Sequence, residues 1–142
     1  MRVWITAAGV LLLLAACGGG SREPVTSGWS EPRHYGYTLR SDCGERLVHG
    51  TLRLTVKDGN VVDADGLDEP GRLTVEVAKL ENLPSLKSLL TEYETAVRGG
   101  ADKATAEFDK GDGHPTRIDL DPRRHAIDDE ACYWISDYQV LG

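Results

Sequence analysis

The residue whose neighbours define its chemistry most fully is Cys17. It ends residues 14–17 (Leu-Ala-Ala-Cys), a lipobox, in which the cysteine thiol receives a diacylglyceryl group before the chain is cut on its N-terminal side. The preceding residues 3–16 are apolar, follow Arg2 and end in small residues, as a secretory signal peptide does. This run is shorter than the ~20 residues that a transmembrane helix needs. The sequence therefore predicts lipidation at Cys17, with an ordinary secreted protein cleaved after Ala16 as the alternative.

These motifs divide the chain into three parts. Residues 1–16 are predicted to be a lipoprotein signal peptide, residues 17–30 a lipidated cysteine and flexible tether, and residues 31–142 a single domain. One acyl chain holds a protein on a membrane only weakly, whereas two or three chains, palmitate among them, hold it stably. We therefore expect an exported protein that is lipid-anchored to the outer face of the cell membrane.

The chain is acidic. Its net charge is −7, and loss of Arg2 with the signal peptide would bring the charge to −8. Nucleic-acid binding depends on Lys and Arg side chains that neutralise phosphates, so the composition predicts no nucleic-acid partner. Anionic lipid headgroups would also repel the domain, so its attachment to the membrane is expected to come from the lipid anchor alone.

Two cysteines remain once Cys17 carries lipid, namely Cys43 and Cys132. Outside the cytoplasm a single pair is expected to form one structural disulfide. A redox-active or zinc-binding pair would need a C-x-x-C motif or histidines at ligand spacing, and the sequence has neither.

The elements that must position these residues follow from the apolar periodicity. Strands are predicted where apolar and polar residues alternate, over residues 35–40, 51–57, 61–64, 104–109, 117–121 and 131–140. Residues 73–80 fit a short strand or a helix nearly equally. A helix of about four turns is predicted from Pro84 to Arg98, because apolar residues recur there at helical spacing. With short connections between strands, the predicted fold class is α+β: an antiparallel sheet of about five to six strands with one amphipathic helix packed on it.

The hairpin in residues 51–64 turns around Gly59. A two-residue loop would pair Leu54 with Asp63 and place that carboxylate on the apolar face. A three-residue loop with Gly59 in the left-handed conformation would instead pair Leu54 with Val62. We therefore predict the three-residue, bulged loop.

Five carboxylates gather near one predicted loop: Asp119, Asp121, Asp128, Asp129 and Glu130. Oxygen ligands at this density are what Ca²⁺ prefers, and an exported protein meets that ion. The alternative is a solvated acidic loop whose carboxylates cap turns and pair with nearby arginines. Calcium is the one metal or cofactor that the sequence suggests.

No set of residues points to catalysis. The four histidines are scattered, and no two of them are spaced as i and i+4 for zinc. No serine lies in a complete nucleophile motif, and paired carboxylates are too common in so acidic a chain to indicate an acid–base pair. We therefore predict no catalytic residues and no enzymatic activity.

Aromatic residues lie at the two ends of the domain, and the last strand carries Tyr133, Trp134 and Tyr138. Tyr and Trp give a binding surface a large contact area at low entropic cost. Tyr133 faces opposite to Trp134 and Tyr138, so one set would be exposed unless both faces of the sheet are covered. These three are the predicted ligand-binding residues, and packing in the core is the alternative.

A series of short motifs runs through nearly the whole mature domain. They are Tyr35-x-Tyr37-x-Leu39 before Cys43, residues 56–61 (Val-Lys-Asp-Gly-Asn-Val), 113–121 (Gly-His-Pro-x-x-Ile-x-x-Asp) and 128–133 (Asp-Asp-Glu-x-x-Tyr). In this order they resemble an uncharacterised bacterial family, domain-of-unknown-function family 6174, which is common among small lipoproteins. That family often carries a C-x-C pair where this chain has only Cys43, so the resemblance implies no disulfide pattern. It implies one compact domain in an exported lipoprotein, and no activity.

The leading hypothesis is a non-enzymatic, lipid-anchored domain of the cell envelope. Its partners would be the membrane, through the lipid anchor, and another envelope protein or ligand, bound through the sheet face. A calcium-dependent envelope domain that uses the acidic loop is the alternative.

Overall fold

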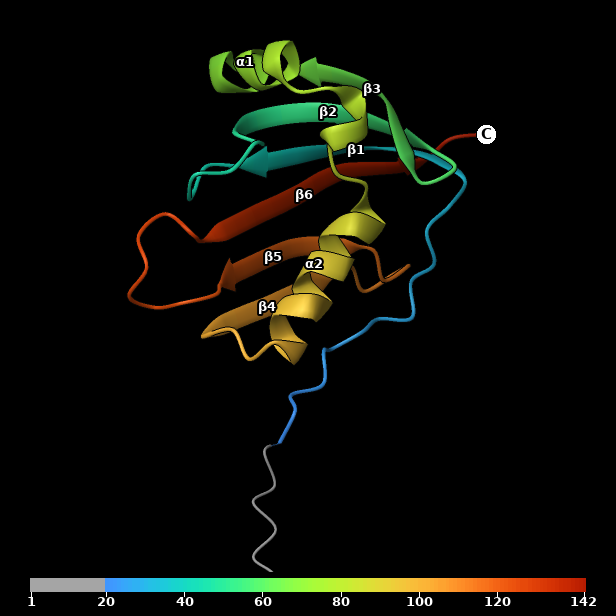
Figure 1. Ribbon diagram of the computed structural model, residues 1–142. Helices are drawn as coiled ribbons and strands as arrows, with labels where there is room; N and C mark the ends of the chain where they lie inside the picture. The colour runs from blue at the N-terminus through green and yellow to red at the C-terminus, as the bar shows by residue number, and fades with distance from the viewer. Residues whose placement is uncertain (1–19) are drawn as a thin grey trace, which may run out of the picture.

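The computed structural model describes residues 20–142, so the predicted signal peptide and the predicted lipidation site Cys17 lie outside the described residues. These described residues form one six-stranded antiparallel sheet with two helices and a short 3₁₀ turn (Figure 1). In chain order the elements are β1 (His34–Ser41), β2 (Gly50–Lys57), β3 (Asn60–Gly66), α1 (Glu69–Val77), η1 (Leu80–Asn82), α2 (Leu86–Arg98), β4 (Lys103–Phe108), β5 (Pro115–Asp121) and β6 (Ala131–Val140). The strands lie in the order β3-β2-β1-β6-β5-β4.

The sheet consists of two successive three-stranded meanders. β1, β2 and β3 pair in sequence, as do β4, β5 and β6, and the first and last strands pair at the centre. Alternation along the strands decides which face is buried: Tyr35, Tyr37 and Leu39 of β1 are fully buried, as are Leu52 and Leu54 of β2. The predicted α+β class and antiparallel sheet are confirmed.

Helix α1 lies where the periodicity left strand and helix open, and the strand alternative is wrong. Asp68 caps the helix, because its Oδ1 accepts a hydrogen bond from the backbone N–H of Gly71 at 2.7 Å, and Pro70 lies in the first turn. Thr74 is buried and Val75 packs against the core. The sheet therefore carries two helices, where the sequence predicted one.

The first turn of α1 lies directly on the sheet because three glycines leave room for the backbone. A Cβ on Gly71 would clash with the carbonyl oxygen of Thr51 in β2, and one on Gly50 or Gly66 would clash with backbone atoms of α1. Gly50 also has a φ of +86°, which favours glycine. The same Thr51 carbonyl accepts a hydrogen bond from the N–H of Leu67 at 2.8 Å. The position of α1 therefore depends on backbone contact rather than on interlocking side chains.

Asp68 also joins α1 to β2, because its Oδ1 accepts a second hydrogen bond, from the backbone N–H of Thr51 at 3.0 Å. The N–H of Thr51, and after it that of Gly71, lower the pKa of this carboxyl. Replacing Asp68 with alanine is expected to lower the free energy of unfolding by about 1 kcal/mol at pH 7. A lowered pKa means that this stabilisation is complete above the ordinary carboxyl pKa of about 4 and is lost as the pH falls through the lowered value.

Urea unfolding of the parent, Asp68→Ala and Asp68→Asn at several pH values between 7 and 2 measures this effect. The gap between parent and Asp68→Ala should narrow as the pH falls below about 4. Asp68→Asn is the matched control, because its amide oxygen can still cap the helix but does not titrate. A gap that stays constant down to pH 2 would show that the ionised carboxylate does not stabilise the fold.

The β2–β3 hairpin turns differently from the prediction. Its loop has two residues, 58 and 59, with φ of 50° and 80°, so the predicted three-residue loop is wrong. A register shift further along leaves Val62 as an extra residue of β3. Leu54 consequently pairs with Ala64, and Asp63 pairs with Thr55 instead of facing Leu54. The bulge that keeps the carboxylate off the apolar face lies within the strand rather than in the turn.

Helix α2 begins at Ser85, whose hydroxyl oxygen accepts a hydrogen bond from the N–H of Ser88 at 3.2 Å. The apolar residues that recur at helical spacing in this segment face the sheet: Leu86, Leu89, Tyr93 and Val97 are buried, and Leu90 is partly buried against the core. No helix within residues 20–142 is long and apolar enough to cross a membrane.

The segment before β1 lies against the domain, although the sequence predicted a flexible tether as far as residue 30. Arg22 donates a hydrogen bond to the carbonyl oxygen of Ala101 at 3.2 Å. Trp29 packs against the core, and its indole N–H lies 3.3 Å from the hydroxyl oxygen of Tyr138. The packed part of the chain therefore begins near Arg22, close to the junction of α2 and β4.

Cys43 and Cys132 form the predicted disulfide, with Cα atoms 5.8 Å apart. It links the loop after β1 to the start of β6. Beside it, the N–H of Glu45 donates a hydrogen bond to the carbonyl oxygen of Asp128 at 3.1 Å. The β1–β2 and β5–β6 loops are thus held together at one end of the sheet.

Candidate functional site

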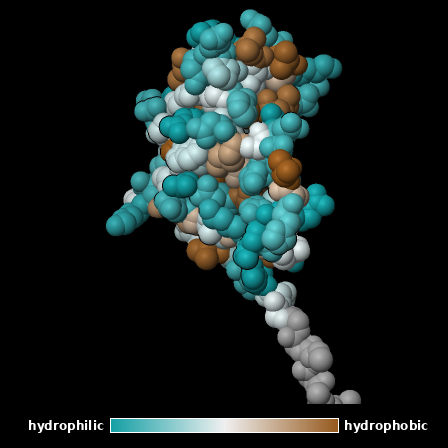
Figure 2. Space-filling view, turned by 90° about the vertical axis from the view of Figure 1, so that its left-hand side faces the viewer, coloured by the Kyte–Doolittle hydropathy of each residue, from teal (hydrophilic) through white to brown (hydrophobic). Residues whose placement is uncertain are grey.

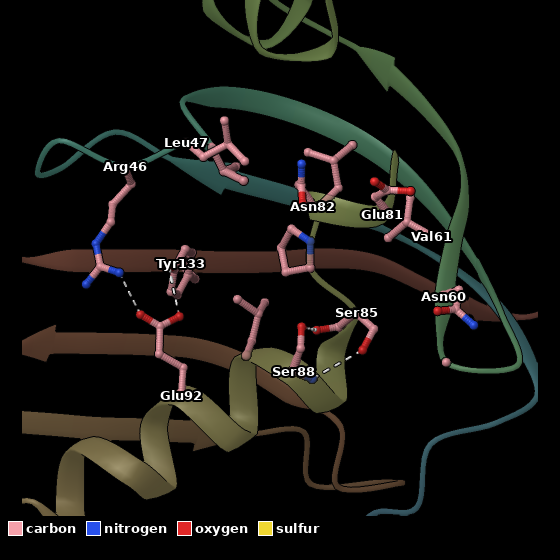
Figure 3. A pocket seen from close by; sticks show the side chains of 15 residues that line it. Arg46, Leu47, Asn60, Val61, Glu81, Asn82, Ser85, Ser88, Glu92 and Tyr133 are labelled. Carbon is pink, nitrogen blue, oxygen red and sulfur yellow. Dashed lines mark hydrogen bonds and ion pairs between the residues drawn. The ribbon is translucent and has the colours of Figure 1, made fainter. Parts of the chain in front are cut away.

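A groove lies between the two helices on the buried side of the sheet. α1 packs on β2 and β3, η1 packs on β3, and α2 packs on β4 and β5, so neither helix lies squarely over the central strands β1 and β6. There, η1 and the start of α2 border a cavity of about 410 Å³, which we call the central groove (Figure 3). Small-molecule sites commonly occupy about 300–1,000 Å³.

One end of the central groove carries a charged network from three separate elements. Arg46 of the β1–β2 loop forms an ion pair with Glu92 of α2, with Nη1 and Oε1 2.8 Å apart (Figure 3). The hydroxyl of Tyr133 in β6 donates a hydrogen bond to the other carboxylate oxygen of Glu92 at 3.2 Å. Burial, and then the negative charge of Glu92, raise the pKa of Tyr133. Its hydroxyl therefore keeps its proton and remains a hydrogen-bond donor.

The guanidinium of Arg46 is held by more than its ion pair. Its Nε donates to the carbonyl oxygen of Glu130 at 3.3 Å, and its Nη2 donates to that of Asp129 at 3.2 Å. Both carbonyls belong to the loop that the disulfide ties to the loop of Arg46. The Arg46 and Glu92 side chains are still 30% and 33% exposed, so a molecule in the groove can reach both.

The opposite end is built by η1 and the first turn of α2. Exposed Asn82 lines the groove next to Glu81, and the side chains of Ser85 and Ser88 lie together further along (Figure 3). Ser88 donates its hydroxyl to the carbonyl oxygen of Ser85 at 2.8 Å. Leu83 and Leu89 are buried and give the wall an apolar part. The groove therefore combines amide, hydroxyl and charged groups over an apolar base.

Two buried tyrosines of β1 fix the wall of the groove to the sheet. The hydroxyl of Tyr37 donates to the carbonyl oxygen of Pro84 at 2.5 Å. The hydroxyl of Tyr35 donates to Glu31 at 2.6 Å and accepts the N–H of Leu86 at 2.9 Å. Burial is the largest cause that raises the pKa of both hydroxyls, so both remain neutral donors. The start of α2 is thus positioned directly by the central strand.

The three predicted aromatic residues do not form one surface. Tyr133 is buried and faces the central groove. Tyr138 packs against the core, with its ring stacked on His114 at a centroid distance of 4.2 Å. Trp134 lies on the opposite face of the sheet from Tyr133, between Arg40 and Arg117, whose guanidinium carbons are 4.7 and 5.3 Å from its ring centroid. Only Tyr133 contributes to the groove.

The five predicted calcium ligands do not converge. Within residues 20–142, no three of Asp119, Asp121, Asp128, Asp129 and Glu130 bring carboxylate oxygens within 4.8 Å of one another. Asp119 pairs with its own-strand neighbour Arg117 at 2.8 Å, and Asp129 pairs with Arg123 at 3.2 Å. The structure therefore does not bring these carboxylates together over β5, and arginines pair with two of them. Calcium binding by this loop stays a prediction.

One group of potential metal ligands does converge in the described part of the chain: Asp109, Asp112 and His114 in the β4–β5 loop. Its carboxylates already accept local hydrogen bonds. Asp109 accepts the N–H of Gly111 at 2.7 Å, and Asp112 accepts that of His114 at 3.0 Å. The N–H of His114 is the largest cause that lowers the pKa of Asp112. These bonds account for the cluster as a network that orders the loop.

Sequence reasoning missed the residues of the central groove. Arg46, Asn82 and Glu92 come from a loop, a turn and a helix, and no motif connects them. Glu92 lies on the predicted helix, but on the side next to the apolar stripe, where a carboxylate is ordinary. Only Tyr133 was singled out in advance, because a large aromatic residue near a strand start suggests contact area.

The groove can bind but has no arranged catalytic group among the described residues. No histidine or cysteine lines it, and its serine hydroxyls bond the backbone of α2. The lining holds one arginine, Arg46, and two glutamates, Glu81 and Glu92, so it is weakly acidic. Such a surface suits a ligand that offers both hydrogen-bond donors and acceptors.

Comparison with known proteins adds one finding. A family model described as a family of unknown function, DUF6174, matches residues 28–140, a range that includes Trp29, all six strands and every residue of the groove. No curated protein and no solved structure matches the chain.

Proposed function

Because this chain belongs to the family of unknown function DUF6174, which carries no assigned activity, we propose its role from its own site: a non-enzymatic, lipid-anchored protein of the cell envelope that binds a small polar ligand in the central groove. The observation that carries the proposal is the network of Arg46, Glu92 and Tyr133 at one end of a cavity of about 410 Å³. Polar groups held rigidly at one end of a partly apolar cleft are typical of a specificity-determining contact.

Rigid placement of Arg46 supports binding rather than mere surface pairing. Exposed ion pairs contribute little to stability, and a long side chain loses entropy when it is fixed in one position. Here the guanidinium is fixed by Glu92 and by the carbonyl oxygens of Asp129 and Glu130. A ligand meets a preorganised site and does not have to order Arg46 itself, which favours affinity.

The anchor and the compartment are part of the same proposal. The lipobox and the signal-like segment support lipidation of Cys17, and a disulfide supports an oxidising compartment. Arg22 bonds Ala101 at the α2–β4 end of the domain, and the following residues run from this end to Trp29, which contacts Tyr138 of β6 (Figure 1). We propose that this end faces the membrane while the groove remains open to the envelope space.

The groove proposal predicts a discrete adduct in intact cells when a benzophenone side chain replaces Asn82 in the groove lining. Glu92→Gln should reduce the yield about tenfold, since the neutral amide breaks the ion pair and leaves Arg46 without its charged partner. Glu107→Gln, on exposed β4, is the matched control and should leave the yield unchanged. Mass spectrometry of the purified protein measures the yield and the added mass.

A benzophenone at exposed position 139, outside the groove, shows whether the capture is specific. The same added mass at positions 82 and 139, or no adduct at position 82, would overturn binding in the groove. Cys17→Ala in the same cells tests the anchor, because the variant should move from the membrane fraction to the soluble fraction. A variant that stays with the membranes would overturn lipid anchoring and leave the groove result intact.

A further inference from the structure

Helix α1 carries apolar residues on its outer side as well as on the side that packs against the sheet. Gly71 and Thr74 are buried on the inner side. Pro70, Leu73 and Val77 recur at i, i+3 and i+7 on the outer side and are exposed, Leu73 to 55% and Val77 to 74%. We call these three residues the α1 stripe.

The α1 stripe is part of a wider apolar area. Leu67, just before α1, is 54% exposed, and Leu80, in η1, is 41% exposed. Other exposed apolar side chains, such as Ile127 and Val140, are widely separated along the chain. Figure 2 shows apolar side chains gathered over the upper end of the molecule, where α1 lies. A helix that needs only one apolar face to dock on its sheet has no structural use for the second.

The charges around the α1 stripe indicate what kind of partner it can bind. Glu69 and Glu76 lie on the same side of α1, next to the stripe, and Glu81 follows in η1. Exposed Arg72 of α1 and Lys79 before η1 are the basic residues of this region, so these five side chains together carry a charge of −1. The whole chain has a net charge of −7. Two copies with this excess of negative charge would repel one another, and an anionic bilayer would repel the domain as well. A complementary surface carries apolar side chains bordered by Lys or Arg.

The position of the stripe also argues against the bilayer. Arg22 bonds the carbonyl of Ala101 at the α2–β4 end, and Figure 1 shows α1 at the other end of the molecule from the segment that leads to residue 20. If the chain is anchored near Cys17, the stripe points away from the membrane.

We propose that the α1 stripe is the docking surface for a protein partner whose contact segment carries apolar residues bordered by Lys or Arg. This inference does not rest on a ligand in the central groove, because the stripe is on the outer side of α1 and none of its residues lines the groove. The two sites therefore allow the domain to hold a small molecule and a protein partner at once.

Photocrosslinking from position 77 of the full-length protein in intact cells tests the proposal. A benzophenone at this position should give one protein adduct, and mass spectrometry of the crosslinked peptide should show apolar residues next to Lys or Arg. Leu73→Asp should reduce the adduct about tenfold, since it places a charge in the apolar contact. Reversal of the border charge in Glu69→Lys with Glu76→Lys should reduce it about fivefold.

The controls separate docking from folding. A benzophenone at Val140, an exposed apolar residue at the end of β6, should not give this adduct. Leu73→Asp should keep the melting temperature of the parent to within about 2 °C, since Leu73 packs on nothing that the fold requires. An adduct with a second copy, an adduct with lipid, an acidic contact peptide, or no adduct beyond the Val140 control would each overturn the proposal. Absence of the groove adduct at position 82 would not affect the proposal that the α1 stripe binds a protein.

Discussion

Replacing Cys43 and Cys132 with alanine is expected to lower the free energy of unfolding by roughly 4–5 kcal/mol. The disulfide joins residues 89 apart in sequence. In the chain-entropy model, closing so long a loop removes many conformations from the unfolded chain, and the cost of regaining them gives this free energy. The total stability of a domain is commonly about 5–15 kcal/mol, so the variant should lie near the limit of folding.

Urea unfolding at pH 7 measures the loss, with parent and variant both carrying Cys17→Ala so that no third thiol contributes. Reduction of the parent should move its unfolding midpoint to that of the double-alanine variant, whose own midpoint should not respond to reductant. If the reduced parent, with both thiols confirmed free, unfolded at the same urea concentration as the oxidised parent, the disulfide would not stabilise the domain.

Gly71→Ala should destabilise the protein by about 2 kcal/mol. On helix propensity alone the change would stabilise α1 by about 1 kcal/mol, because alanine is the better helix former. The added Cβ, however, would meet the carbonyl oxygen of Thr51, and Gly71 is buried at this contact. α1 would have to move off β2, which would strain the bonds that Asp68 makes to Thr51 and Gly71. The steric clash therefore makes the expected change in stability negative, although helix propensity alone would make it positive.

Gly99→Ala is the matched substitution for this test. Gly99 ends α2 with a φ of −76°, which any residue can adopt. We expect its stability to change by no more than about 0.5 kcal/mol. Thermal and urea unfolding of both variants give the comparison. A Gly71→Ala protein as stable as its parent would show that α1 does not need to touch β2.

The strands of the sheet could be predicted because a half-buried strand needs only alternating apolar and polar residues. Tyr35, Tyr37 and Leu39 alternate with small or polar residues, and the structure buries all three. Helix α1 was harder because Pro70 and Gly71 weaken its pattern and because Leu73 and Val77 lie on its exposed side. The hairpin register was missed because a bulge at Val62 satisfies the same burial requirement as a longer turn.

Most residues of the candidate site could not be predicted from the sequence. Arg46, Asn82 and Glu92 are common polar residues, and only the long-range pairing of β1 with β6 brings their elements together. The acidic loop presents the opposite case. Density of carboxylates along the chain suggested a shared ligand, whereas Arg117 and Arg123 pair with Asp119 and Asp129 separately.

The pairing of the first strand with the last has a consequence for the order in which the chain becomes structured. Leu39 pairs with Ile135, and Tyr35 pairs with Val140, so the centre of the sheet joins the two ends of the domain. If the N-terminal part of the chain folds first, β1, β2 and β3 can pair early. One edge of β1 then stays unpaired until β6 is available. Pairing over so long a separation is slow to form, because the entropy of loop closure opposes it. The two halves of the sheet therefore stay separate until the C-terminal strand β6 is in place, and the pairing of β6 with β1 joins them.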